Sequence, residues 1–140
     1  MNLGSSVRSF LEEPRYAVLA TLHPNGAPHL TEMWYALRGD EVIINTTEER
    51  TKKRNLEADP RVSLLVAGRK GEPTWDRLAY VRVDGTVRRI ATGKDALEDI
   101  IALSIRYDGP ESEASARAMF GSMHRVTYAL TITRVYPKGV

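Results

Sequence analysis

Runs of apolar residues separated by polar turns predict about six β-strands and three or four short helices in this chain. The predicted strands span residues 16–22, 27–37, 41–45, 61–67, 78–90 and 125–135. The helices are indicated by apolar stripes at helical spacing or by capping signals. They span residues 5–12, 46–58, 92–107 and 112–120.

Short polar turns join consecutive predicted strands, which favours antiparallel pairing. Pro24 and Gly26 mark the turn after the first strand, and Gly39 lies in the next one. Gly85, inside the fifth strand, predicts a bulge or a bend there. Helices do not alternate regularly with strands, so a doubly wound fold is not expected. We predict a mostly β fold with flanking helices, in which six antiparallel strands close into a barrel.

Length and composition exclude several classes of protein. A chain of 140 residues holds one core, so residues 1–140 are expected to form a single domain. A formal net charge of +2 does not indicate general affinity for nucleic acid. The absence of cysteine excludes disulfides, thiolate catalysis and cysteine metal sites. No apolar run approaches the roughly 20 residues that span a bilayer, and no signal-peptide core precedes the first helix. We therefore expect a cytoplasmic protein.

Motifs of several enzyme classes are absent. The chain contains no G-x-S-x-G, no G-x-G-x-x-G and no Walker sequence. Its three histidines, His23, His29 and His124, match no compact metal-ligand spacing. The sequence therefore predicts neither a serine hydrolase, nor a Rossmann or P-loop nucleotide site, nor a metal centre.

Two arginines and two lysines lie within residues 50–54, directly after the third predicted strand. Such a run is typical of the solvated face of a helix, and Thr46 with Glu49 forms a capping box that would begin this helix at residue 46. Cations at the rim of a sheet, beside the free N–H groups of a helix N-terminus, also make an anion site. The residues alone leave both interpretations open.

The second predicted strand carries large flat and flexible side chains in the run PHLTEMWY, residues 28–35. A packed hairpin with one aromatic-rich face accounts for this pattern. A flat ring system laid on the same surface would find backbone donors and acceptors, and apolar contact from Met33, Trp34 or Tyr35.

Six segments in this order resemble those of the pyridoxamine-phosphate-oxidase-like split β-barrel proteins, and within them the small deazaflavin (coenzyme F420)-dependent oxidoreductases. The segments are AVLATL at 17–22, PNGAPHL at 24–30, VIINTT at 42–47, RTKKRNL at 50–56, DPRVSLLV at 59–66 and YVRVDGTV at 80–87. The resemblance covers about residues 7–136, nearly the whole chain.

The resemblance implies a homodimer with two cofactor sites at the subunit interface. The cofactor phosphate would be held by Arg50 and Lys52, with Asn55 nearby. A helix that begins at Thr46 would place Arg50 and Lys52 on nearly opposite faces. If both residues hold one phosphate, this helix should instead begin nearer Thr51. The other implied cofactor-binding residues are Thr31, Met33, Trp34, Tyr35, Ile44, Asn45 and Thr46, with Leu78 and Ala79 near the partner's site.

The compact length favours coenzyme F420 as the cofactor, with flavin mononucleotide (FMN) as the alternative. The implied reaction is hydride transfer from the reduced cofactor to an electron-poor small molecule such as an enone, a quinone or a tetrapyrrole. Two other functions remain open: an FMN-binding oxidoreductase or flavin reductase, and a non-catalytic protein that carries the cofactor. The sequence assigns no catalytic residue.

Overall fold

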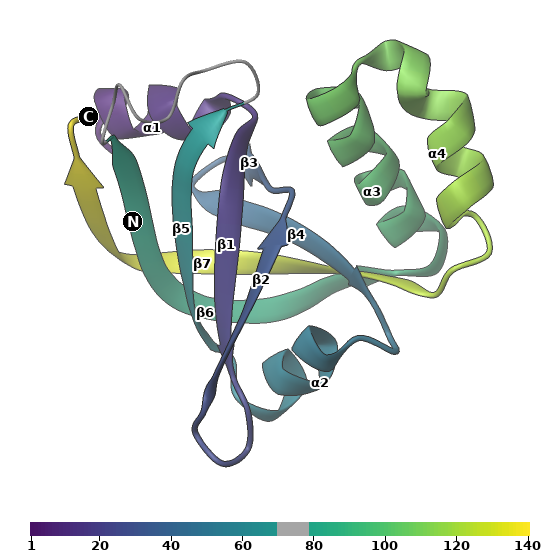
Figure 1. Cartoon of the computed structure of the whole chain (residues 1–140), viewed down its shortest axis with the longest axis horizontal. Helices are drawn as coiled ribbons and strands as arrows, with labels where there is room; N and C mark the ends of the chain where they lie inside the picture. The colour runs from purple at the N-terminus through teal and green to yellow at the C-terminus, as the bar shows by residue number, and fades with distance from the viewer. Residues whose placement is uncertain (70–78) are drawn as a thin grey trace.

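Seven antiparallel strands form one sheet that curls into a barrel in the computed structural model, which describes residues 1–69 and 79–140 (Figure 1). Neighbouring strands follow the order β2-β1-β5-β6-β7-β4-β3. Their bounds are β1 Arg15–Leu22, β2 Pro28–Met33, β3 Ala36–Arg38, β4 Glu41–Thr47, β5 Arg61–Arg69, β6 Tyr80–Thr92 and β7 Arg125–Lys138. The mostly β fold is confirmed, but the predicted count of six strands is wrong by one.

The additional strand arises because the predicted strand at 27–37 is interrupted at Trp34 and Tyr35. β2 pairs with β1 at one edge of the sheet, whereas β3 pairs with β4 at the opposite edge. Between them, Tyr35 bonds to helix side chains instead of a strand. Its N–H donates to the Tyr107 hydroxyl at 3.3 Å, and its carbonyl accepts from Nε of Arg106 at 2.9 Å. The sequence pattern shows that both halves are extended, but not which strand each half pairs with.

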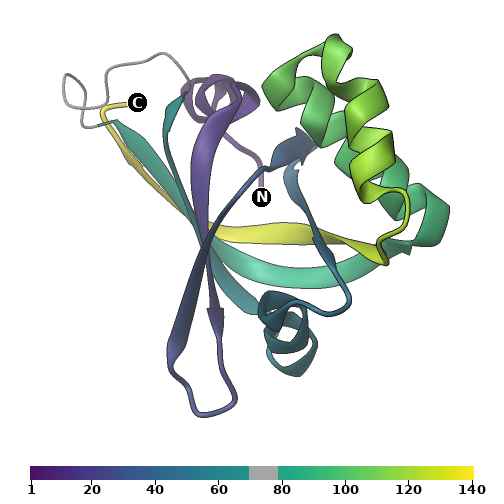
Figure 2. The same cartoon turned by 45° about the vertical axis from the view of Figure 1, so that its right-hand side comes forward.

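The α-helices lie outside the sheet. α1 and α2 lie at opposite ends of the barrel, while α3 and α4 pack together on one side (Figures 1 and 2). The bounds are α1 Ser5–Glu12, α2 Thr51–Ala58, α3 Gly93–Asp108 and α4 Glu113–Phe120, with a 3₁₀ turn at Pro110–Ser112. Within residues 1–69 and 79–140, no helix has the length and apolar character needed to cross a membrane.

The barrel interior is filled by alternate strand residues, because successive side chains of a strand point to opposite faces. Leu19, Leu64, Val83 and Leu130 are completely buried there. β4 is buried on both faces. The reason is that α3 covers its outer face, where the amide of Asn45 donates to the Ala96 carbonyl at 2.9 Å.

Arg106 of α3 ties the helix layer to the barrel. Besides Tyr35, its guanidinium donates to the carbonyls of Leu11, Glu12 and Glu13 at 2.7–3.1 Å. These carbonyls lie at the end of α1, where a helix leaves its last acceptors without intrahelical partners. One side chain thus holds α1, α3 and the crossing between the two sheet edges together.

The basic helix begins at Thr51, so the capping-box prediction of a helix from Thr46 is wrong and the later start is confirmed. Thr46 and Thr47 pair with Val126 and Arg125 of β7, and this ladder keeps their backbone extended.

The predicted bulge at Gly85 is confirmed. The register between β6 and β7 shifts between Asp84 and Gly85. A Cβ at Gly85 would collide with the Thr131 carbonyl, so only glycine fits this close approach of two strands.

Candidate functional site

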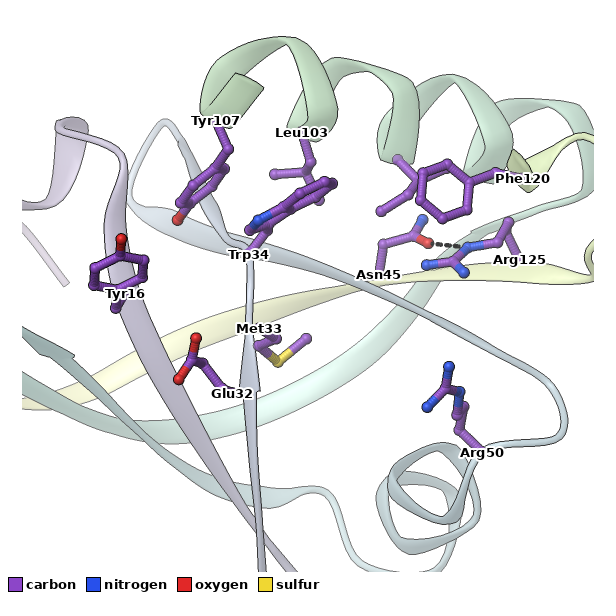
Figure 3. A pocket seen from close by; sticks show the side chains of 11 residues that line it. Tyr16, Glu32, Met33, Trp34, Asn45, Arg50, Leu103, Tyr107, Phe120 and Arg125 are labelled. Carbon is purple, nitrogen blue, oxygen red and sulfur yellow. Dashed lines mark hydrogen bonds between the residues drawn. The ribbon is translucent and has the colours of Figure 1, made fainter. Parts of the chain in front are cut away.

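A hollow of about 440 Å³ opens between the edge strand β2 and the helices α3 and α4 (Figure 3). Its lining combines aromatic and apolar side chains with a few polar ones, as is usual for ligand pockets. We call it the aromatic hollow. Its lining residues are Tyr16, Glu32, Met33, Trp34, Asn45, Arg50, Ile100, Leu103, Tyr107, Phe120 and Arg125.

A second hollow of about 400 Å³ adjoins the first, since Glu32 and Arg50 line both. We call it the basic hollow. Its lining residues are His29, Thr31, Glu32, Arg50, Thr51 and Lys52. The two hollows form one trough along β2, with an aromatic end and a cationic end. Glu32, an exposed side chain, is the acid among the lining residues.

The aromatic end is built around a stacked pair. The rings of Trp34 and Tyr107 lie 5.4 Å apart and are inclined by 13°. The Tyr107 hydroxyl donates to the Arg15 carbonyl at 2.7 Å, which fixes its ring. Because Trp34 lies where the chain crosses between sheet edges, the same contacts that complete the barrel also position this wall of the trough.

Arg50 and Lys52 have no acidic partner within the part of the chain that the structure describes. Their neighbour Lys53 differs, because its ammonium lies 2.9 Å from the carboxylate of Glu48. Burial lowers the pKa of Lys52 to about 8, and the nearby charges of Arg50 and Arg125 add to this effect. Cations that lie close together and are not paired with an acid favour binding of an anion.

Arg125 is a third cation of the trough, only 8% exposed. Its Nε donates to the side-chain oxygen of Asn45 at 2.7 Å, and its guanidinium lies 5.0 Å from the Phe120 ring centre. Burial, together with the nearby charge of Arg50, lowers its pKa to about 10. Asn45 is itself held by Thr127, whose hydroxyl accepts from its amide at 2.9 Å. The guanidinium is therefore fixed without being neutralised.

The N-terminus of α2 adds donors to the same place. Arg50 is the N-cap residue and provides no side-chain acceptor, and the first turn contains no acid. The first backbone N–H groups of a helix lack intrahelical acceptors and carry a partial positive charge. The buried hydroxyl of Thr31 also has no hydrogen-bond partner among the described residues. Two cations, a free helix N-terminus and an orphaned hydroxyl fit a phosphate group.

The structure brings six of the predicted cofactor residues to the trough: Thr31, Met33, Trp34, Asn45, Arg50 and Lys52. Four others point elsewhere. Tyr35 and Ile44 belong to the barrel core. Thr46 is buried without lining the trough, and the Asn55 amide donates to the Thr21 hydroxyl at 3.1 Å.

Ala79 packs against the core beside the start of β6. Leu78 lies outside the described residues, so the expected contribution from this segment to a partner's site stays a prediction.

Nine lining residues of the trough were not predicted as site residues from the sequence: Tyr16, His29, Glu32, Thr51, Ile100, Leu103, Tyr107, Phe120 and Arg125. Those from α3 and α4 lie far along the chain from the basic cluster, and nothing local marks them as site residues. Arg125 could have been noticed in the sequence, because it is a charged residue at the start of a strand that is otherwise predicted to lie in the core.

The barrel, interrupted between two sheet edges and carrying a trough along its edge strand, defines a split β-barrel protein. A family model described as pyridoxamine 5'-phosphate oxidase matches residues 3–138. The chain belongs to this family.

Three solved structures illustrate the likeness. An F420 reductase shares 29% identity over 96% of this chain and 98% of its own, with a TM-score of 0.73. A conserved hypothetical protein, Rv2991 from Mycobacterium tuberculosis, shares 30% over 98% and 84%, with a TM-score of 0.77. HutZ, the haem storage protein from Vibrio cholerae, shares 17% over 99% and 96%, with a TM-score of 0.70, which is a likeness of fold alone.

Proposed function

We propose that this protein is an oxidoreductase that uses coenzyme F420 to reduce an electron-poor small molecule of the enone, quinone or tetrapyrrole type. The observation that carries the proposal is the trough, in which three cations without acidic partners adjoin an aromatic hollow. Similarity to an F420 reductase over nearly the full length of both chains supports the choice of cofactor.

The basic hollow would hold the cofactor phosphate through Arg50, Lys52 and the free N–H groups at the start of α2. Thr31 would supply a further hydrogen bond from its unpartnered hydroxyl. The ring would lie in the aromatic hollow beside Trp34. When bound, the reduced deazaflavin supplies a hydride, which is chemistry that no side chain offers.

The protein would contribute position and burial. Of the described strands, only β1 pairs with β2, so the other edge of β2 leaves backbone donors and acceptors free beside the trough. These groups can orient the polar edge of a ring. Leu103 and Phe120, on the opposite wall, would exclude water from its apolar part.

FMN is the main competing cofactor, because it also joins a phosphate to a flat ring and the same donors suit it. A titration with coenzyme F420, FMN and haem, followed by fluorescence or absorbance, separates the possibilities. We expect F420 to bind most tightly. Tight binding of FMN or haem with none of F420 would contradict the proposal.

Lys52 and Lys53 provide a matched pair for this titration. Lys52→Ala should weaken F420 binding about tenfold or more, because a charge-assisted hydrogen bond contributes roughly 1.5–3 kcal/mol. Lys53→Ala removes the same charge from the next position, where it is paired with Glu48, and should change affinity little. Equal losses in the two variants would show that general charge, and not the trough, attracts the cofactor.

We further propose a homodimer with the cofactor sites near its interface. The outer face of β1, β2 and β5 exposes large apolar residues beside the trough, among them Tyr16, Leu65 and Leu30, the last 64% exposed. Leu30→Glu should convert a dimer into monomers in light scattering, while Met119→Glu, an equally exposed site on α4, should not. A monomeric parent protein would refute this arrangement.

A further inference from the structure

Arg125 also lines a third hollow, of about 500 Å³, which shares no other residue with the trough. This hollow lies between the segment after β4, the N-terminus of α3 and the turn from α4 to β7. Its lining residues are Glu48, Thr92, Gly93, Lys94, Leu97, Gly121, Met123, His124 and Arg125. The proposed cofactor site makes no use of it.

The Arg125 guanidinium has donors to spare for a ligand in this hollow. It carries five N–H groups. Nε donates to Asn45 at 2.7 Å, and Nη1 makes a 3.6 Å contact with the sulfur of Met123. Within the described residues no carboxylate pairs with it. Arg125 is 92% buried, and leaving its N–H donors without acceptors in this position is energetically unfavourable. Binding of an anionic acceptor would therefore be favourable here.

Lys94 provides a second cation from another element. It is an exposed residue in the first turn of α3 and forms no ion pair within residues 1–69 and 79–140. Glu48 is the acid of the lining, but its carboxylate already contacts Lys53 at 2.9 Å and Arg89 at 3.0 Å. Two cations beside one compensated acid suit a monoanion better than a dianion, which the Glu48 charge would repel.

Thr92 and His124 add polar side chains to the lining, and the remaining residues are apolar or glycine. Leu97 and Met123 offer apolar surface, and Gly93 and Gly121 line the hollow with backbone atoms alone. A carboxylate would meet Lys94 and Arg125, and a short apolar chain attached to it would lie against Leu97 and Met123.

We propose that this third hollow binds the carboxylate and apolar chain of the substrate through Lys94 and Arg125, so that the substrate class is an electron-poor enone, quinone or tetrapyrrole that carries an apolar carboxylate side chain. The substrate role rests on the proposed function, whereas the binding itself does not. Because Arg125 faces both cavities, a carboxylate held by it lies next to the aromatic end of the trough.

Hexanoate and its neutral isostere hexanamide test the site in the protein without added cofactor. Amide resonances of the backbone, followed by nuclear magnetic resonance, give both the position and the affinity. Hexanoate should shift Gly93 and Gly121 and should bind about tenfold more tightly than hexanamide. Lys94→Met should weaken hexanoate binding about threefold and leave hexanamide unchanged. Lys138→Met, a loss of the same charge at the far end of β7, should change neither.

Equal affinity for the two probes, or shifts at Trp34 and Tyr107 in place of Gly93 and Gly121, would overturn the site.

The substrate role is tested by repeating the titration with the cofactor bound. Retained hexanoate binding supports that role, and displacement of hexanoate by the cofactor refutes it. Failure of the proposed function would appear separately, as absence of cofactor binding, and would leave the hexanoate measurement in the free protein unaffected.

Discussion

The side-chain oxygen of Asn45 accepts a 2.7 Å hydrogen bond from Nε of Arg125, and this bond places a buried guanidinium between two hollows without neutralising it. Asn45→Asp should weaken binding of a phosphate-bearing cofactor about tenfold, because the new carboxylate would pair with Arg125 and cancel its charge. Thr127→Val removes another bond of Asn45 without adding charge, and should leave affinity much closer to that of the parent. Calorimetric titration of the three proteins measures both effects. Unchanged affinity in Asn45→Asp would mean that Arg125 does not face the cofactor.

Binding of the cofactor should weaken as the pH rises through about 8. Burial and the neighbouring cations lower the pKa of Lys52 to about 8, so the free protein loses this charge above that pH. A bound phosphate favours the protonated form, so binding takes up a proton there. Affinity measured at pH 7 and at pH 9 should differ severalfold in the parent and much less in Lys52→Met.

The same pKa has the opposite effect on the stability of the ligand-free protein. Between about pH 8 and 10.5 the unfolded chain holds the Lys52 proton while the folded chain has released it. Because the unfolded state binds more protons there, the free energy of unfolding gains a contribution that increases with pH. Urea unfolding of the parent and of Lys52→Met across this range isolates the contribution. An identical pH dependence in both proteins would contradict the lowered pKa.

Gly85→Ala should destabilise the fold severely, by about 3 kcal/mol or more. The added methyl group would collide with the Thr131 carbonyl on the neighbouring strand, and neither backbone can move without breaking the β6–β7 ladder. Gly4→Ala introduces the same methyl group into open space and serves as the control. Thermal unfolding of both variants decides the matter, and equal melting temperatures would refute the close approach at Gly85.

Arg106→Met should cost about 3 kcal/mol of unfolding free energy, because four backbone carbonyls lose a charged donor. Arg117→Met removes an exposed arginine that pairs with Glu98 and Glu113 at the surface, and should cost less than about 1 kcal/mol. If the two substitutions cost the same in urea, Arg106 would not hold α1 and the strand crossing in place.

The sequence predicts much of the fold because most strands have a clear apolar face. It does not predict the division at Trp34 and Tyr35. Both residues continue the extended pattern, and the partners that interrupt it, Arg106 and Tyr107, lie about seventy residues away. The start of α2 at Thr51 also depends on distant residues. Thr46 and Thr47 pair with β7, so Thr46 cannot cap a helix as predicted.

The candidate site follows from the sequence at its cationic end and along β2, where Met33 and Trp34 were predicted, but not in the helical wall of its aromatic end. Arg50 and Lys52 are neighbours in the chain, so their cluster is visible. Asn55 belongs to the same segment, yet helical geometry turns its side chain towards Thr21 in the interior. The helix residues of the opposite wall, such as Tyr107 and Phe120, come to the trough only through the packing of α3 and α4 on the barrel.

The two walls of the trough differ in how freely they can change during evolution. The wall formed by β2 belongs to the barrel sheet, and substitutions there can disturb the pairing of β2 with β1. Leu103 and Phe120, on the other wall, lie outside the barrel core cluster. Substitutions at these positions can reshape the aromatic hollow while the interior of the barrel keeps its packing. Relatives of this protein could therefore acquire new ring ligands through the helical wall while keeping the same cationic end.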